Sequence, residues 1–340
     1  MPPDYPCESM KRWLLLGSLL LVAGCGGATK RSTDAVQAVP SEHGIRAAVQ
    51  RASNPSVGDF PAAAGKTLQQ VADELRGGPQ LAMASSVFSV GRDRMAFGVI
   101  AKDGTPIYGP TAVYVAPSPD KPAQGPFVAP ADVLLTEKRY RSRQAADTSD
   151  PFVAVYGASV PFDKRGSYAV LSATKTSSGL TGATASINVL AKGADPIPEV
   201  GSKAPRVHTD TLASAKGDVS KIDTRVPPDD MHKVDFASVV GKKPVALLFS
   251  TPQLCTSRVC GPVTDIALQM KAKYGDRMEF IHQEVYVNND PNQGLRDPLL
   301  EFHLQTEPWL FVVDKTGKIT ARLEGSIGVR QFEAAVKSGL

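Results

Sequence analysis

Two cysteines five residues apart, Cys255 and Cys260, are the residues whose type and spacing point most directly to chemistry. They follow an apolar stretch that predicts a buried strand, and they open a predicted helix. Because a helix N-terminus carries about half a positive charge, it favours a thiolate over a thiol at Cys255. The nearby Arg258 either adds to this effect or is a solvated charge without a role. The pattern predicts thiol–disulfide exchange, with Cys255 as the nucleophile and Cys260 as the resolving thiol.

The Cys-x4-Cys spacing constrains where the helix can begin. On a regular helix the Cα atoms of residues 255 and 260 would lie about 8 to 9 Å apart, whereas a disulfide tolerates at most about 7 Å. Either Cys255 precedes the first turn, or that turn unwinds on oxidation. In both cases we expect residues 255–262 to differ between the oxidised and reduced forms, and amide hydrogen exchange would detect the difference.

The other two cysteines lie in a segment with the order of a secretory signal. Lys11-Arg12 precedes the apolar run 13–23, which is too short for a membrane-spanning helix. Small residues then lead to Cys25 in a pattern that resembles the lipobox of bacterial lipoproteins, which implies that Cys25 carries the lipid anchor. Acidic residues before Met10 do not fit this order, so we expect translation to start at Met10 and to exclude Cys7.

Export would leave Cys255 and Cys260 as one pair in an oxidising compartment. We therefore expect the protein at the extracytoplasmic face of the cell membrane, held by its lipid. The alternative interpretation of the pair is a single stabilising disulfide.

Length and composition set further bounds. A chain of 340 residues with 42% hydrophobic content has room for about two domains. The net charge of +4 is small and the basic residues are scattered, so no nucleic-acid partner is expected. The histidines have no paired spacing, which predicts no metal site, no cofactor and surface or loop positions for all five: His43, His208, His232, His282 and His303.

The sequence divides into four parts. Residues 1–25 form the signal segment, and 26–80 read as a polar tether with one short helix over 67–76, capped by Thr67. Short β-branched and aromatic runs over 81–195 predict an all-β immunoglobulin-like sandwich, with a hairpin turn at Asp103-Gly104. A proline-rich linker, 196–205, opens the last domain. The expected strands of the sandwich lie at 94–101, 111–116, 151–160, 168–174 and 185–190.

Residues 200–340 alternate between predicted strands and helices in the order βαβαββα. That order, the cysteine pair between strand and helix, Thr306-Glu307-Pro308 before a strand and the hairpin around Asp314–Ile319 resemble the thioredoxin-like redoxins. The resemblance implies an α/β thioredoxin-like fold for this domain. The expected strands lie at 245–250, 278–287 and 309–323, the last being a hairpin, and the expected helices at 256–274, 298–304 and 329–337.

The resemblance also implies substrate-binding residues. It makes Pro308 a cis proline that faces the cysteines and presents backbone groups to an extended peptide, with Glu307 and Thr251 beside it. Thioredoxins also bury an acid beneath the cysteines. Here Glu284 is the candidate, although strand alternation favours an edge or outward-facing position for it.

Two relatives within the redoxins offer alternatives. Residues 251–261 are similar to the peroxiredoxin Q segment Thr-Pro-x-Cys-Thr-x-x-x-Cys, which implies a thiol peroxidase, but Pro308-Trp309 stands where those enzymes keep an arginine. The Sco-type copper-assembly proteins are also exported, and they add a histidine where this chain has Glu307 and Pro308. The third copper ligand is therefore expected to be missing.

We predict an exported, lipid-anchored thiol–disulfide oxidoreductase without a cofactor. Its expected partners are exported protein thiols or a membrane thiol donor. The alternatives are a peroxiredoxin Q-like peroxidase and a binding or copper-handling lipoprotein without enzymatic activity.

Overall fold

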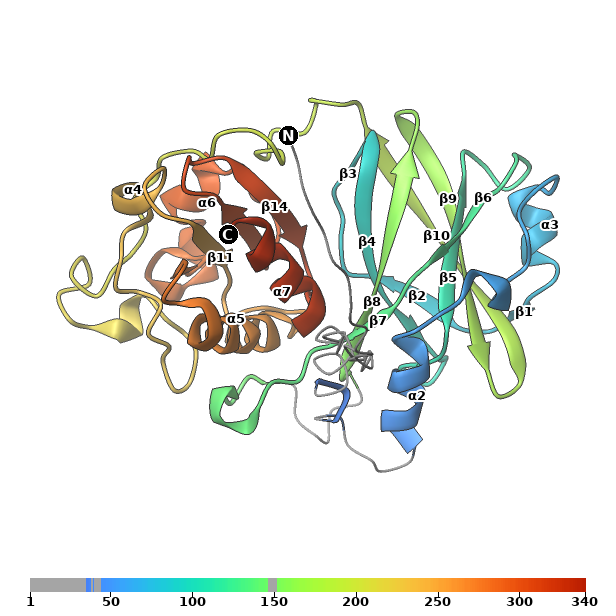
Figure 1. Ribbon diagram of the computed structural model, residues 1–340, viewed down its shortest axis with the longest axis horizontal. Helices are drawn as coiled ribbons and strands as arrows, with labels where there is room; N and C mark the ends of the chain where they lie inside the picture. Colours follow the sequence, from blue (N-terminus) through green and yellow to red (C-terminus); the bar gives the residue numbers. More distant parts are fainter. Residues whose placement is uncertain (1–34, 38, 40–43, 146–151) are drawn as a thin grey trace, which may run out of the picture.

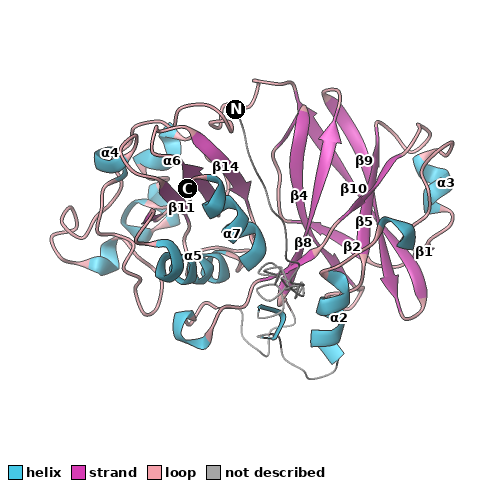
Figure 2. Ribbon diagram, viewed as in Figure 1, coloured by secondary structure: helices cyan, strands magenta, loops and turns pink. Residues whose placement is uncertain are grey.

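The computed structural model describes residues 35–37, 39, 44–145 and 152–340, which form two domains lying side by side (Figure 1). A domain of strands is followed by a domain in which helices cover a sheet (Figure 2). The predicted multidomain architecture, a β-sandwich followed by an α/β domain, is confirmed at this level. Met10, Cys7 and Cys25 lie outside the described residues. Among the described residues, no helix is long and apolar enough to cross a bilayer.

The first domain is a sandwich of two mainly antiparallel sheets. One sheet has the order β1-β10-β9-β5-β6, with β3 beside β10, and the other has the order β2-β4-β8-β7. Alternate apolar residues of β4, β5 and β8 point between the sheets, among them the stacked rings of Phe97 and Tyr156. The strands are β1 (Arg76–Gly77), β2 (Gln80–Met83), β3 (Phe88–Ser89), β4 (Gly91–Ile100), β5 (Thr111–Ala116), β6 (Gln124–Val128), β7 (Ala131–Val133), β8 (Ala154–Phe162), β9 (Gly166–Thr176) and β10 (Gly179–Leu190).

One contact in the sandwich is typical of immunoglobulin-like domains. The Tyr168 hydroxyl, near the start of β9, donates a hydrogen bond to the Lys164 carbonyl at 3.0 Å. A tyrosine that bonds back to the backbone a few residues upstream fixes the corner into a late strand in such folds.

The predicted tether over 26–80 is wrong for its described part. Helix α2 (Ile45–Ala52) buries Val49 and Ala52 in the sandwich core, and Phe60, Leu68 and Val71 pack with apolar residues of β5 and β9. The apolar residues have no sustained period, yet they cover surface that the sheets leave exposed. This segment also contains a 3₁₀ helix, Val57–Asp59, and the short helix α3, Leu68–Ala72.

Helix α3 begins as predicted and ends early. The Thr67 hydroxyl accepts from the Gln70 amide at 3.2 Å, and the Gln70 side chain accepts from the Thr67 amide at 2.8 Å, which is a capping box. The helix stops after Ala72 because Arg76–Gly77 pairs with β10 as strand β1.

The Asp103-Gly104 turn forms, but it does not join two paired strands. Gly104 has a φ of 88°, and its amide donates to the Ala101 carbonyl at 2.9 Å. Strand pairing beyond the turn is limited to one bridge between Ile100 and Pro106, because β4 and β5 belong to different sheets. The predicted hairpin is therefore a corner between the two layers.

From β11 onward the second domain has the predicted order βαβαββα, and a short helix, α4, precedes it that was not predicted. Strand β11 lies at the centre of a four-stranded sheet, parallel to β12 and antiparallel to β13, in the order β12-β11-β13-β14. Helices α5 and α7 pack on one face and α4 and α6 on the other, so every residue of β11 and β13 is buried, and successive residues join the cores on opposite faces. The elements are α4 (Phe236–Val239), β11 (Val245–Phe249), α5 (Cys260–Tyr274), β12 (Glu279–Gln283), α6 (Asp297–Glu301), β13 (Trp309–Val313), β14 (Ile319–Glu324) and α7 (Val329–Ser338).

Polar contacts lock the two domains together. Asp132 of β7 accepts hydrogen bonds from the Arg330 and Gln331 amides at 3.0 and 2.8 Å, so a sandwich carboxylate caps the first turn of α7. The Glu324 carboxylate at the end of β14 accepts from the Ser86 and Val87 amides at 2.8 and 3.0 Å. These bonds fix the position of the α/β domain against the sandwich.

Candidate active site at the paired cysteines

The two cysteines lie on either side of the start of helix α5. Cys255 belongs to a turn that follows β11, where its amide donates to the Thr251 carbonyl at 3.1 Å, and Cys260 is the first residue of α5. Helix α5 therefore begins four residues later than predicted, because Arg258 adopts a left-handed backbone with a φ of 58°. Of the two geometries that the Cys-x4-Cys spacing allows, the structure has the one in which Cys255 precedes the first turn of the helix.

The sulfur atoms are close enough to react. Both thiols are free and buried, and their Sγ atoms lie within 4.8 Å of each other. A disulfide needs about 2.05 Å, so the two sulfurs must approach each other on oxidation. Since Cys255 is outside the helix, the approach can occur in the turn without unwinding α5.

The pKa values of the two thiols are shifted in opposite directions. A hydrogen bond from the Cys260 thiol lowers the pKa of Cys255 to about 5, helped by the Ser257 hydroxyl and by the Cys260 and Val259 amides, against the opposing effect of burial. The Ser257 oxygen stands 3.1 Å from the Cys255 sulfur. Burial, followed by the neighbouring Cys255 sulfur, raises the pKa of Cys260 well above its ordinary value. Cys255 is thus the thiolate and Cys260 the protonated thiol.

The pKa of Cys255 gives a pH prediction for the full chain carrying Cys7→Ser and Cys25→Ser. The ultraviolet absorbance of the thiolate should titrate with a midpoint near pH 5, and the rate of Cys255 alkylation should rise through that pH and level off below neutrality. Thiolate is lost only below the midpoint, so the rate at pH 7 should be close to its maximum. A midpoint near the ordinary value of about 8.5 would contradict this assignment.

Neither of the two residues expected to tune the cysteine pKa is among the groups that shift the pKa of Cys255. Arg258 is exposed and is not among the groups that lower the pKa of Cys255. Glu284 follows the edge strand β12 but is fully buried, so the outward-facing position favoured by strand alternation is wrong. Its carboxylate accepts from the Thr224 amide and hydroxyl at 2.7 and 2.6 Å, and the Thr224 hydroxyl accepts from the Gln253 amide. Glu284 therefore supports the cysteine turn through Thr224.

Of the expected substrate-binding residues, Glu307 lines the cleft beside the cysteines, whereas Pro308 is buried and, like Thr251, is not part of the cleft lining. The Glu307–Pro308 peptide is cis, as predicted. The half-buried Glu307 carboxylate has an oxygen within 4.8 Å of both sulfurs, and burial and the Cys255 charge raise its pKa. Thr251 is fully buried and is absent from the cleft lining, so direct substrate contact by its side chain is not supported.

A cleft of about 1350 Å³ lies beside Cys255 and involves both domains. The α/β domain contributes the cysteine turn, Thr306 and Glu307. The sandwich contributes strand β2 and residues of β4 and β8, so much of its wall is apolar. The sandwich residues in the lining include Ala82, Met83, Gly98, Ile100, Phe152 and Ala154.

The prediction that all histidines lie on the surface or in loops is wrong for His282, which belongs to strand β12, and the loop residue His232 is buried beside it. His232 and His282 are 2% and 0% exposed, with their ring centroids 4.9 Å apart. Asp229 and Asp223 lie against them. The Asp-x-x-His spacing of Asp229 and His232 is the local sequence signal that could have indicated this group of two histidines and two aspartates. His208 and His303 are exposed, and His43 lies outside the described residues.

No family model and no curated protein matches this chain. Among solved structures it is similar to a thiol:disulfide interchange protein of the thioredoxin family from Chlorobium tepidum TLS, with 16% identity and a TM-score of 0.29 over 42% of this chain and 98% of that one. It is also similar to the PKD domain of the human VPS10 domain-containing receptor SorCS2, with 14% identity and a TM-score of 0.18 over 36% of this chain and 79% of that domain. Both likenesses are distant.

Proposed function

We propose that the protein is a thiol–disulfide oxidoreductase, held by a lipid on Cys25 at the extracytoplasmic face of a membrane. The observation that carries the proposal is the pair of close sulfurs with opposite acidities, Cys255 as thiolate and Cys260 as thiol, beside an open cleft. A purely structural bridge does not need a thiolate that forms near pH 5. The low pKa makes Cys255 both a ready nucleophile and a good leaving group.

The reaction proceeds in two exchanges. The Cys255 thiolate attacks one sulfur of a substrate disulfide, and the other substrate sulfur leaves as a thiolate that takes up a proton. The Cys260 thiol then loses its proton and attacks the Cys255 sulfur, which breaks the mixed disulfide and releases the second substrate thiolate. The substrate gains two electrons and the cysteine pair is oxidised. A membrane thiol donor would reduce the pair again, and the same steps in reverse oxidise a dithiol.

The substrate class that fits the cleft is an extended segment of an exported protein. Apolar residues of β2, β4 and β8 form one wall, and the cysteine turn with Thr306 and Glu307 forms the other. A chain placed between these walls would bring a cystine to Cys255. The sandwich would then select and orient substrates by contacts with their side chains.

The test is reduction of a disulfide-linked peptide by the full chain carrying Cys7→Ser and Cys25→Ser. We expect turnover with an external dithiol, and its loss to the uncatalysed rate when Cys255→Ser is added. Absence of turnover, with a pair that resists mild reductant, would leave only a structural disulfide. Consumption of peroxide that depends on Cys255, without peptide reduction, would instead favour the peroxidase alternative.

Glu307 is proposed to accept the proton that Cys260 must lose. Among the described residues its carboxylate oxygen lies within 4.8 Å of both sulfurs, and burial and the Cys255 charge raise its pKa, which makes it a stronger base than an exposed glutamate. Glu307→Gln should slow release of the second substrate thiol about tenfold or more, while alkylation of Cys255 changes little. Stopped-flow decay of a preformed mixed disulfide measures this step. Equal decay rates in the variant and the parent would contradict the role.

A second candidate function is metal handling by the same pair. The sequence predicted that a third ligand is missing, but the Glu307 carboxylate stands within 4.8 Å of both sulfurs and is a third donor. Copper uptake by the reduced chain that is lost in Cys255→Ser and weakened in Glu307→Gln would support this candidate. Thiolates favour Cu(I), so the assay requires a reductant that does not bind copper.

A further inference from the structure

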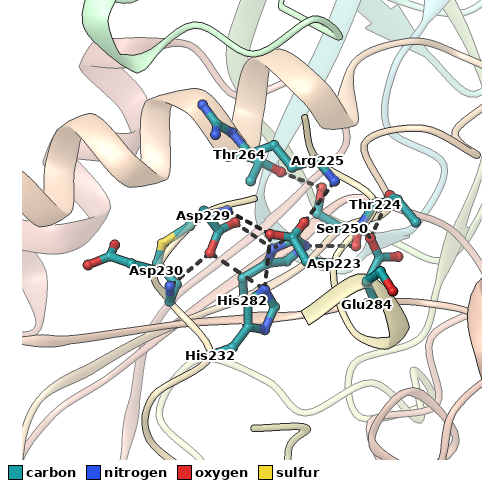
Figure 3. A network of polar contacts seen from close by, with 12 residues as sticks. Asp223, Thr224, Arg225, Asp229, Asp230, His232, Ser250, Thr264, His282 and Glu284 are labelled. Atoms are coloured by element: carbon teal, nitrogen blue, oxygen red, sulfur yellow. Dashed lines mark hydrogen bonds and ion pairs between the residues drawn. The ribbon is translucent and has the colours of Figure 1, made fainter. Parts of the chain in front are cut away.

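Four buried side chains that are not part of the cleft lining form a polar cluster (Figure 3). Asp223, Asp229 and His232 belong to the loop before α4, and His282 belongs to β12. Their exposed fractions are 4%, 8%, 2% and 0%. One nitrogen or oxygen of each lies within 4.8 Å of those of the other three. The loop and the strand thus bring two carboxylates and two imidazoles to one enclosed point.

The distances between these atoms bracket those of ligands around a small cation. His232 Nε2 stands 3.5 Å from Asp223 Oδ2 and 3.5 Å from Asp229 Oδ1, and His282 Nδ1 stands 2.8 Å from Asp229 Oδ2 and 4.0 Å from Asp223 Oδ1. Four ligands bound tetrahedrally at the usual zinc distances are separated by about 3.3 to 3.6 Å. The two His232 distances match this range, whereas His282 and the carboxylates would have to adjust when an ion binds.

The buried ring of His232 lacks the polar partners that such a side chain normally has. Neither of its ring nitrogens has a hydrogen-bond partner among the described residues, although the side chain is buried. Its Nε2 points at both carboxylates from a distance too long for good hydrogen bonds. Leaving a buried polar group unpaired costs about 1 to 3 kcal/mol. A cation between Nε2 and the two carboxylates would remove that cost.

His282 is already oriented as a metal ligand. Its Nε2 lies 3.0 Å from the Ser250 carbonyl, which can only accept, so Nε2 carries a hydrogen. Nδ1 then faces the Asp229 carboxylate at the hydrogen-bond distance of 2.8 Å, so zinc binding would require Nδ1 to release its proton and the two atoms to move apart. A ligating histidine that donates its other N–H to a backbone carbonyl is the usual outer-shell pattern.

The nearby cationic side chains are engaged elsewhere. The Arg225 guanidinium donates to Asp265 at 2.9 Å and to the Pro227 and Tyr140 carbonyls. Arg225 contacts Asp223 through its backbone amide and not through its guanidinium. No lysine or arginine side chain among the described residues forms an ion pair with Asp223 or Asp229. The negative charges of these two buried carboxylates must therefore be balanced by the histidines or by a bound cation.

We propose that Asp223, Asp229, His232 and His282 bind one Zn²⁺ ion. Four protein ligands without an open position make this a structural site that holds the loop 222–232 against β12. The site also borders the cysteine turn, because Ser250, whose carbonyl orients His282, contacts the Cys260 carbonyl through its hydroxyl at 3.3 Å. Zinc would thus stabilise the residues that support the active pair, independently of whether the proposed oxidoreductase activity is correct.

The experiment measures zinc in the full chain with all four cysteines replaced by serine, which removes every thiolate ligand. We expect about one zinc per chain after purification without chelator, retained on dialysis. His232→Ala should lose the zinc and keep the fold, because this side chain makes no hydrogen bond that the fold would miss. The matched control, His208→Ala, removes an exposed histidine and should keep the zinc. A cysteine-free chain without zinc, or a His232→Ala variant that retains it, would overturn the proposal.

Cobalt gives a second readout that needs no variant of the cluster. Co²⁺ added to the zinc-depleted, cysteine-free chain should show the intense visible ligand-field absorption of a tetrahedral site, without the ultraviolet charge-transfer band of thiolate ligation. The weak spectrum of hydrated octahedral cobalt would overturn the proposal. Because thiolates are absent, a positive result cannot arise from the cysteine pair, and it says nothing about turnover.

Discussion

Cys260→Ala is expected to stop turnover while leaving the first chemical step intact. Without the second thiol, the Cys255 mixed disulfide can be resolved only by external thiol. The loss should be about a hundredfold or more, because a neighbouring group reacts at an effective concentration far above that of a millimolar reagent. The mixed disulfide should accumulate and be seen as the added mass of the peptide. The single-turnover attack should remain measurable in the same sample.

The same substitution should also make Cys255 less acidic. The hydrogen bond from the Cys260 thiol is the largest cause that lowers the pKa of Cys255, so its removal should shift the titration midpoint upward from about 5. Cys260→Ser is the matched control, since it also lacks the resolving thiol but keeps a hydroxyl donor at the same position. Its midpoint should lie between those of the parent and Cys260→Ala. Identical midpoints in all three chains would show that the hydrogen bond does not set the acidity.

Much of the cysteine site could be predicted because its information is local. An apolar run ending next to two cysteines predicts strand, turn and helix, and β11 and α5 lie where the pattern put them. The start of α5 was predicted four residues early because the left-handed backbone of Arg258 interrupts the helical path, and nothing in that residue type predicts it. The later start is what lets Cys255 approach Cys260 without unwinding the helix.

Features that join distant segments could not be predicted. The buried cluster unites Asp223 with His282, 59 positions apart, and the chain contains only a weak local spacing for half of it. The segment 44–65 was predicted to be a tether because its apolar residues have no period, although the sandwich supplies a surface for them to cover. Likewise, the sandwich forms one wall of the cleft, and this wall could not be predicted because the sequence was interpreted one domain at a time.

Arg94→Ala is expected to lower the free energy of unfolding by about 2 to 4 kcal/mol, because it removes several hydrogen bonds from a charged donor at once. Arg94 extends from β4 of the sandwich into the α/β domain, where its guanidinium donates to the Gln331 side chain and the Glu324 carbonyl at 2.8 Å each, and to the Ser326 carbonyl. Alanine would leave these acceptors, at the end of β14 and the start of α7, without their donor. Urea unfolding followed by circular dichroism measures the loss.

Arg92→Ala is the matched control on the same strand. The Arg92 side chain is exposed and makes only two long contacts, at 3.4 Å, to Ser159 of its own domain. Its removal should change the free energy of unfolding by about 0.5 kcal/mol or less. Equal losses in the two variants would show that Arg94 does not join the domains. If Arg94 does join them, Arg94→Ala should also separate unfolding into two transitions and raise the peptide KM, since the cleft beside Cys255 needs both domains held in place.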